Sequence, residues 1–205
     1  MAGPKRDVVV RTASRSDRRR VAEVLGRAFQ VEPVYEWLYP GTGLRARRLP
    51  LLLGTFVWRL HPGLGIVEVA VADGEVIGAA VWDRPGAVRA GPVRTARALP
   101  GMLRAVGSRL PKLAALGEAL EKARPEESHW YLFHLGADPE WQSRGAGTAL
   151  LRARLEQCDI DGLPAYLECK QSHVPYYARF GFEVIGEVKI DDSLSTLTMW
   201  REPAR

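Results

Sequence analysis

The amino-acid sequence predicts a mixed α/β fold, in which strands and helices alternate early and strands pair as hairpins late. β-Branched runs alternate with segments at helical spacing, and the last two apolar runs, 182–190 and 195–200, follow each other directly. Asp73-Gly74 joins two further apolar runs and is a strong hairpin signal. With 205 residues and 46% hydrophobic residues, the chain is long enough for a substantial core. We therefore expect residues 1–205 to form a single domain.

The first elements are a strand and a helix. Residues 8–12 form a β-branched run that predicts the first strand. Ser14, Ser16 and Asp17 are suitable N-cap and first-turn residues for a helix that continues to about Ala28. The apolar residues of this segment fall on one helical face.

The next elements are two helices and a hairpin. A short helix is expected at 33–38. Pro50 stands where a proline at the first helical position would, and it predicts a helix that covers 51–60. The runs 66–72 and 76–82 flank the hairpin turn and form its two strands.

The stretch from 84 to 128 changes character. Residues 93–106 and 110–123 have helical spacing, and Pro111 marks their separation. We expect a helical insertion of two helices between strands of the sheet. The remaining elements are a strand at 131–137, an amphipathic helix at 147–158, a buried strand at 165–169, a short helix at 175–180, and two antiparallel strands at 182–190 and 195–200.

Composition limits the classes of partner. The net charge of +5 suits an anionic ligand, but no nucleic-acid-binding module is visible, so we expect no nucleic-acid partner. No stretch has the roughly 18 apolar residues of a membrane helix, and no signal peptide is visible. Cys158 and Cys169 make no disulfide framework, and the histidines show no metal-ligand spacing. We expect a cytoplasmic protein with no metal and no membrane partner.

A glycine-rich loop at 142–147, with the sequence QSRGAG, stands between a predicted strand and a predicted helix. Glycines let the backbone approach a ligand, and a helix N-terminus favours an anion, so the loop predicts a diphosphate site. A dinucleotide site, a coenzyme A site and an ordinary turn into a core helix all fit the loop itself. Residues 138–144 separate the strand from Gly145, which disfavours the dinucleotide, because a Rossmann glycine follows its strand directly.

A second segment carries a resemblance that favours coenzyme A. Leu167-Glu168 precedes the run VPYYARFGF at 174–182. Together with LGADP at 135–139 and the Q-x-x-G-x-G loop, this pattern resembles the GCN5-related N-acetyltransferase (GNAT) superfamily. Val81-Trp82 before the insertion is similar to the puromycin N-acetyltransferase-like branch of that superfamily.

The resemblance implies a fold, an acyl donor and a set of site residues. The implied fold is a mixed, mostly antiparallel central sheet flanked by helices, with a V-shaped splay between the fourth and fifth strands. The implied reaction is direct transfer of an acetyl group from acetyl-CoA to a primary amine of a small molecule, in a ternary complex. The residues implied in binding acetyl-CoA are Leu135, Gly136, Ala137, Gln142, Ser143, Arg144, Gly145, Ala146, Gly147, Thr148 and His173. His173 stands where the family often has asparagine.

Two side chains are expected to take part in the chemistry. Tyr177 matches the tyrosine of the family motif and is the expected proton donor to the leaving thiolate. Tyr176 is expected to point elsewhere and to pack. Glu168 ends a strand beside the donor-binding strand and is the candidate base, directly or through water. Glu32 and Glu36 are further candidates, either as base or in recognition of the amine.

The acceptor side of the site is marked less specifically than the donor side. Strand alternation predicts that His134 points away from Phe133 and Leu135, as a core or supporting residue. Substrate-facing residues are expected from 29–60 and from the insertion at 84–128, as a wall over the acceptor side.

The sequence does not determine the class of function or the oligomeric state. The glycine loop would suit a non-catalytic acyl-CoA-binding domain, or a protein lysine or N-terminal acetyltransferase, as well as an enzyme for small amines. Strand 195–200 is a candidate for pairing across a homodimer.

Overall fold

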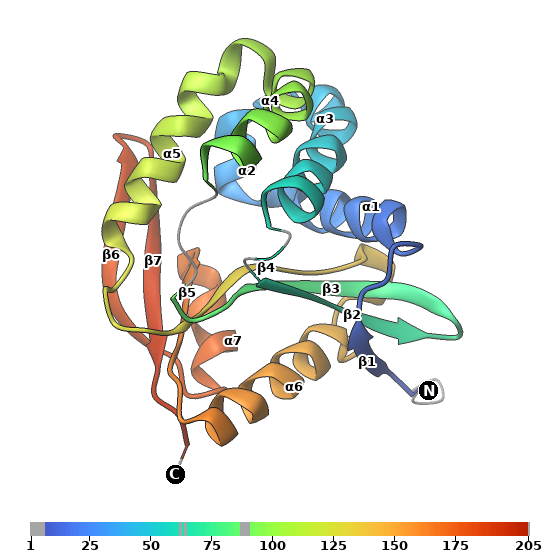
Figure 1. Ribbon diagram of the computed structural model, residues 1–205, viewed down its shortest axis with the longest axis vertical. Helices are drawn as coiled ribbons and strands as arrows, with labels where there is room; N and C mark the ends of the chain where they lie inside the picture. The colour runs from blue at the N-terminus through green and yellow to red at the C-terminus, as the bar shows by residue number, and fades with distance from the viewer. Residues whose placement is uncertain (1–6, 62, 64, 87–90, 205) are drawn as a thin grey trace.

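The computed structural model describes residues 7–61, 63, 65–86 and 91–204, which form one seven-stranded sheet with helices on both faces (Figure 1). The strands are β1 (Val9–Thr12), β2 (Gly65–Ala72), β3 (Glu75–Asp83), β4 (Trp130–Ala137), β5 (Ala165–Cys169), β6 (Glu183–Asp191) and β7 (Leu194–Arg201). The α-helices are α1 (Arg18–Ala28), α2 (Pro33–Leu38), α3 (Thr42–Thr55), α4 (Pro92–Val106), α5 (Leu110–Ala123), α6 (Ala146–Asp161) and α7 (Val174–Ala178). Parts of two expectations, the N-terminal residues 1–6 and residues 87–90 of the insertion, lie outside the described residues.

The sheet splays between β4 and β5. The strand order is β1-β2-β3-β4-β5-β7-β6, and every neighbouring pair is antiparallel except β4 and β5. These two strands are parallel and pair only over 130–132 and 165–167. Beyond that point both strands continue without pairing to each other. This arrangement confirms the predicted mixed sheet with a V-shaped splay between its fourth and fifth strands.

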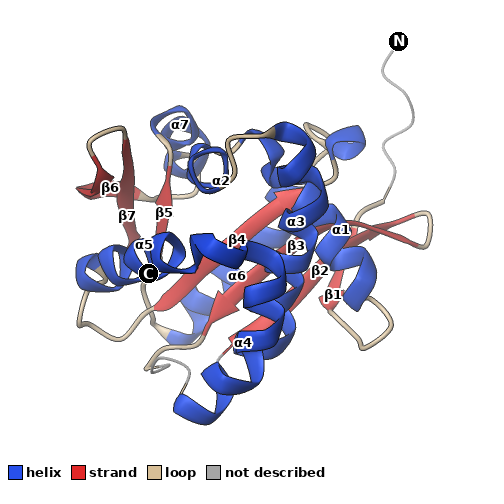
Figure 2. Ribbon diagram, turned by 90° about the horizontal axis from the view of Figure 1, so that it is seen from above, coloured by secondary structure: helices blue, strands red, loops and turns tan. Residues whose placement is uncertain are grey.

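The helices form two layers around the sheet. Helices α1 to α5 pack on one face, and α6 and α7 pack on the other (Figure 1). Consecutive residues of β3 serve the two cores, because Val81 packs with the α1–α3 side and Trp82 with the α6 side. Figure 2 shows β5, β6 and β7 grouped apart from β1 to β4, with α2 and α7 near the separation.

Both predicted hairpins are present. Asp73 and Gly74 have φ angles of 52° and 79°, the positive values that a two-residue type I′ turn requires. At the C-terminal end, β7 lies between β5 and β6, so that both of its edges are paired. The expectation that strand 195–200 pairs across a homodimer is therefore wrong, whereas the homodimer itself stays a prediction.

The third helix differs from its prediction, because Pro50 lies inside α3 and does not begin it. The helix begins at Thr42, and a π-helical turn, Phe56–Leu60, follows it directly. Proline lacks the N–H that an interior position uses and is favoured in the first turn, so the sequence pattern placed the start of the helix at Pro50. A Cβ atom on Gly26 of α1 would lie 2.5 Å from Cγ of Pro50, so α1 and α3 approach closely there.

A β-bulge in β4 determines where His134 points. Val81 pairs with His134 and Trp82 with Leu132, so that Phe133 is an extra residue opposite β3. Phe133 and His134 therefore point to the same face, and their ring centres are 4.3 Å apart. The expectation that His134 points away from Phe133 is wrong, although Leu135 does pack with the opposite core.

The insertion forms the two expected helices, α4 and α5, and α5 supports α2. Lys112 of α5 donates a hydrogen bond to the carbonyl of Trp37 in α2 over 2.8 Å. Its ammonium also lies 3.8 Å from the centre of the Trp37 ring. Within the described part of the chain, no helix is long and apolar enough to cross a membrane.

Candidate active site

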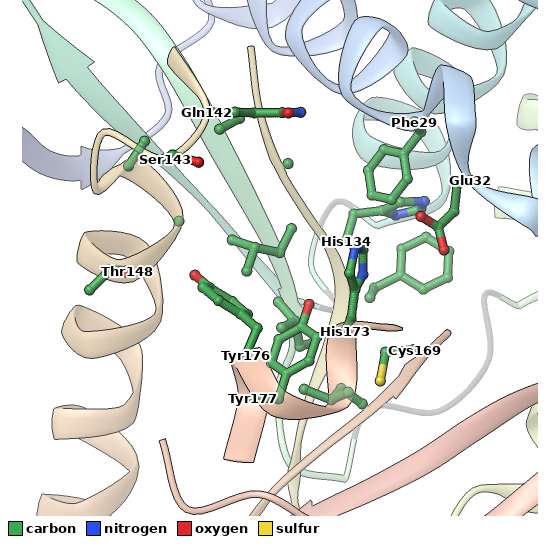
Figure 3. A pocket seen from close by; sticks show the side chains of 18 of the residues that line it. Phe29, Glu32, His134, Gln142, Ser143, Thr148, Cys169, His173, Tyr176 and Tyr177 are labelled. Atoms are coloured by element: carbon green, nitrogen blue, oxygen red, sulfur yellow. The ribbon is translucent and has the colours of Figure 1, made fainter. Parts of the chain in front are cut away.

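The splay of the sheet opens a cleft of about 390 Å³ between β4 and β5 (Figure 3). This volume is typical of small-molecule sites. The cleft extends from the glycine loop before α6 to the segment between α1 and α2. Nearly all residues that the sequence predicted for acetyl-CoA line it: Leu135, Gly136, Ala137, Gln142, Ser143, Gly145, Ala146, Gly147, Thr148 and His173. The two predicted catalytic residues, Tyr177 and Glu168, line it as well.

Arg144 is the one predicted donor-binding residue that does not line the cleft. Its guanidinium carbon lies 5.4 Å from the centre of the Trp141 ring, which does line the cleft. Arg144 does lie in the glycine loop, as predicted, but its side chain lies over Trp141. The loop sequence alone does not specify this side-chain direction.

The glycine loop presents a helix N-terminus to the cleft. Ser143 and Gly145 have φ angles of 61° and 92°, and these left-handed residues turn the chain into α6. The first-turn amides of a helix have no carbonyl partner within the helix. Residues 145–148 line the cleft, so this end can receive an anionic group.

Tyr176 lines the same cleft, which sequence reasoning missed. A Cβ atom on Gly147 would lie 2.8 Å from the Tyr176 hydroxyl, so the glycine lets this ring approach the first turn of α6. Figure 3 shows the hydroxyl directed toward the α6 side and that of Tyr177 directed elsewhere. The sequence did contain a signal for this position. Tyr176 stands next to Tyr177 in the predicted short helix, so both side chains can reach one cavity.

Tyr177 is buried and packed at the cleft wall. The side chain is 8% exposed, and its ring lies 6.0 Å from that of Phe182 in an edge-on arrangement. Gly181, with a φ angle of 86°, turns the chain after α7 so that Phe182 reaches this position. Burial raises the pKa of Tyr177 well above its usual range. The phenol therefore stays protonated and remains a hydrogen donor across physiological pH.

Glu168 lies on β5 in an environment that weakens its acidity. Burial raises the pKa of its carboxyl to about 7, although Tyr131, Arg124 and Tyr166 act in the opposite direction. Its Oε1 atom is buried without a hydrogen-bond partner in the described part of the chain. A carboxylate with a pKa near neutrality is suited to accept and release a proton.

The end of the cleft farthest from the glycine loop brings together residues from separate elements. Phe29 and Glu32 come from the segment between α1 and α2, and His134 comes from the bulge in β4. Figure 3 shows their side chains near His173. The Tyr35 hydroxyl lies 2.5 Å from Nε2 of His134. Burial lowers the pKa of His134 to about 3, so the imidazole is neutral and is a poor proton acceptor.

Two further residues, Glu36 and Cys169, are poorly placed or poorly suited for chemistry in the cleft. Glu36 does not line the cleft, and its half-exposed side chain pairs with Arg45 over 3.2 Å. Cys169 lines the cleft, but burial raises the pKa of its thiol to about 12, which disfavours the nucleophilic thiolate. In the described part of the chain, no group of three or more His, Cys, Asp or Glu residues could hold a metal ion.

The expected wall from the insertion does not line the cleft among the described residues of 84–128. Of residues 29–60, where substrate-facing residues were expected, Phe29 and Glu32 line the cleft. The insertion reaches the site indirectly, through the contact between Lys112 and Trp37 of α2 and through Arg124, whose charge acts on Glu168.

A splayed sheet with a glycine-rich helix N-terminus at its opening can hold an anionic group beside the cleft. The chain belongs to the Acetyltransferase (GNAT) family, which residues 31–182 match. It is thus an acetyltransferase of the GNAT type, as the sequence motifs predicted.

Three proteins illustrate the similarity. An uncharacterised N-acetyltransferase of Schizosaccharomyces pombe is 29% identical over 178 residues, which cover 81% of this chain and 70% of that protein. The L-amino acid N-acetyltransferase AaaT of Escherichia coli is 30% identical over 79 residues, covering 32% of this chain and 44% of that protein. A crystal structure from Corynebacterium glutamicum, of histone acetyltransferase HPA2 and related acetyltransferase, has a TM-score of 0.73 at 24% identity and covers 97% of both chains.

Proposed function

We propose that this protein transfers an acetyl group from acetyl-CoA to a primary amine of a small molecule, directly and within a ternary complex. The observation that carries the proposal is the cleft between β4 and β5, where the glycine loop, Tyr177 and Glu168 face one cavity. The family match supports acetyl-CoA as the donor.

The donor occupies the half of the cleft beside α6. Its diphosphate binds the backbone amides of residues 142–148, while the pantetheine arm follows β4 along Leu135 and Ala137. Because β4 pairs with β5 only up to residue 132, the β4 backbone groups beyond that point that face β5 are open to such an arm, while the opposite edge stays paired with β3. His173 lines the cleft where it can hydrogen-bond the arm.

The chemistry needs a neutral amine and a protonated leaving group. An alkylamine with a pKa near ~10 arrives as an ammonium ion, and the Glu168 carboxylate takes one proton from it, directly or through water. The nitrogen then attacks the thioester carbon, and amides of β4 between Leu135 and Ala137 stabilise the oxyanion. As the C–S bond breaks, the Tyr177 hydroxyl donates its proton to sulfur, and the extra proton of the amide nitrogen restores the phenol.

The rival is a non-catalytic acyl-CoA-binding domain of the same fold. The glycine loop serves both functions equally well, so it does not discriminate between them. Tyr177 and Glu168 favour the enzyme, because a binding domain has no need of a buried phenol and a carboxyl of raised pKa at one cavity.

The test is an acetyl-transfer assay over a panel of amines that includes aminonucleosides, aminoglycosides, polyamines, amino acids and a lysine peptide. Release of coenzyme A thiol is followed, and the acetylated product is identified by mass spectrometry. We expect amine-dependent thiol release with at least one small-molecule amine. Acetyl-CoA binding without turnover on any amine would favour the binding domain, and turnover on the peptide alone would exclude the small-molecule acceptor.

A further inference from the structure

The acceptor end of the cleft is acidic. Among the described residues that line the cleft, Glu32 and Glu168 are the only members of the set Asp, Glu, Lys and Arg. Neither lysine nor arginine belongs to that lining. The lining therefore offers two carboxyl groups to a cationic acceptor and no lysine or arginine to an acceptor carboxylate, while Lys170 and Arg124 act on these carboxyl groups from outside the lining.

Glu32 already binds an alkylammonium group. Its Oε2 atom lies 3.0 Å from Nζ of Lys170, and the two side chains are 18% and 23% exposed. Lys170 follows β5, whereas Glu32 precedes α2, so the pair joins the two sides of the opening. Lys170 itself does not line the cleft. The cleft-facing Glu32 carboxylate is thus oriented and partly desolvated for a primary ammonium.

The charge of Glu32 acts inside the site. Tyr177, Cys169 and His173 each have pKa values shifted mainly by burial, with the Glu32 carboxylate as a further cause. Glu32 is therefore close enough to the reacting groups to interact with a small acceptor. Phe29 and Phe133 belong to the same lining and add apolar surface that suits an alkyl chain.

We propose that the acceptor is an aliphatic diamine or a longer polyamine, and that Glu32 is the residue that selects it. One amine reaches Glu168 and the thioester, while the second ammonium binds Glu32 in competition with Lys170. This inference rests on the proposed function, because it names the acceptor class for the same reaction. It separates this chain from an enzyme for amino acids, whose acceptor carries a carboxylate beside the amine.

The experiment compares three acceptors of matched length at saturating acetyl-CoA: 1,4-diaminobutane, butylamine and 4-aminobutanoate. We expect kcat/KM to be at least about tenfold higher for the diamine than for butylamine, as one charge-assisted hydrogen bond provides. 4-Aminobutanoate should be the poorest of the three. An L-amino acid tested in parallel should be no better than 4-aminobutanoate.

Variants assign the selectivity to Glu32. Glu32→Gln should reduce the ratio of kcat/KM for the diamine to kcat/KM for butylamine from about tenfold to about one, since one charge-assisted contact to the second ammonium is removed. Lys170→Gln should lower the KM for the diamine, because the competing ammonium is absent. Glu36→Gln is the matched control, since Glu36 lies four residues away outside the cleft lining, and it should change no ratio. Thermal melting of each variant checks the fold.

Three results would overturn the inference: equal kcat/KM for diamine and butylamine, a preference for a carboxylate acceptor, or an equal loss for both amines in Glu32→Gln. Any of them leaves the proposed function intact, since turnover is still observed. A turnover-independent readout comes from calorimetric titration of 1,4-diaminobutane into the protein saturated with coenzyme A. Absence of binding, or equal binding by Glu32→Gln, overturns the inference whether or not any amine is acetylated.

Discussion

Tyr177 shows at the residue scale how burial prepares a side chain for catalysis. Its hydroxyl lies at the wall of a cleft, and burial raises its pKa well above the usual range. The phenol is therefore a proton donor that does not ionise near neutral pH. Glu168 differs, because burial brings the pKa of its carboxyl to about 7, where it exchanges protons readily. Burial thus suits Tyr177 to donate a proton and Glu168 to accept one.

Replacement of Tyr177 by phenylalanine tests the donor role. We expect kcat to fall by roughly tenfold or more, because the leaving thiolate loses its proton donor. The Kd for acetyl-CoA, measured by calorimetry, should stay within about twofold, since the ring and its packing remain. Tyr176→Phe is the matched comparison, and its effect should fall on KM for acetyl-CoA. An unchanged kcat in Tyr177→Phe would remove this residue from the mechanism.

The role of Glu168 predicts a pH dependence. Only the ionised carboxyl accepts a proton, so kcat/KM should fall about tenfold for each pH unit below 7 and level off above it. Glu168→Gln should lower kcat/KM at pH 8 and remove the inflection near pH 7. A profile measured from pH 5.5 to 8.5 at constant ionic strength checks this expectation. A wild-type profile that is flat through pH 7 would exclude Glu168 as the base.

At this scale the sequence indicated most of the donor half of the site and little of the acceptor half. The loop residues are predictable because one local motif contains both the glycines and the helix that they precede. Glu32 and Phe29 reach the cleft only through the packing of α1 and α2 on the sheet. Their sequence environment resembles that of any surface helix, so nothing local distinguished Glu32 from Glu36.

At the scale of elements, the hairpin strands and most helices followed from periodicity and turn residues. Asp73-Gly74 predicted its turn because few residues other than Gly, Asn and Asp adopt positive φ readily. The bulge at Phe133 was not predictable, because it depends on how Val81 and Trp82 pair with β4. The predicted start of α3 at Pro50 was wrong for a related reason, because the interior proline packs against Gly26 of α1, a contact that the local sequence does not show.

The contact between α1 and α3 gives a test at this scale. A Cβ atom at position 26 would lie 2.5 Å from Cγ of Pro50, so Gly26→Ala should push the helices apart. We expect the free energy of unfolding to fall by about 1–3 kcal/mol, as for other overpacked cores. Gly43→Ala in α3 is the control, because nothing lies within 4 Å of the added Cβ. It should stabilise the protein by about 0.5–1 kcal/mol through helix propensity.

Chemical denaturation followed by circular dichroism measures both changes. A destabilisation by Gly26→Ala no larger than that of a surface substitution would contradict the tight contact. Loss of stability in both variants would instead point to a general intolerance of side chains in these helices.

At the scale of the whole molecule, the site exists because the sheet divides. The parallel pairing of β4 and β5 ends after three residues on each strand, and the cleft opens where it ends. The cores on the two faces are separate, so β4 presents Leu135 on the α6 side and His134 on the α1 side, and both residues line the cleft. The sequence motifs predicted this splay through family resemblance. Hydrophobic periodicity alone predicted the strands, but it did not predict that β4 and β5 diverge.

Every step proposed for the cleft depends on its binding acetyl-CoA as the acyl donor, and isothermal titration of acetyl-CoA into the protein tests this binding. We predict saturable binding of one acetyl-CoA per chain, with a Kd on the order of 1–100 µM. Gly145→Val should weaken binding by about tenfold or more, because a β-branched residue does not tolerate the φ angle of 92° at the loop. Absence of binding heat at millimolar acetyl-CoA would contradict the assignment of the cleft as the donor site.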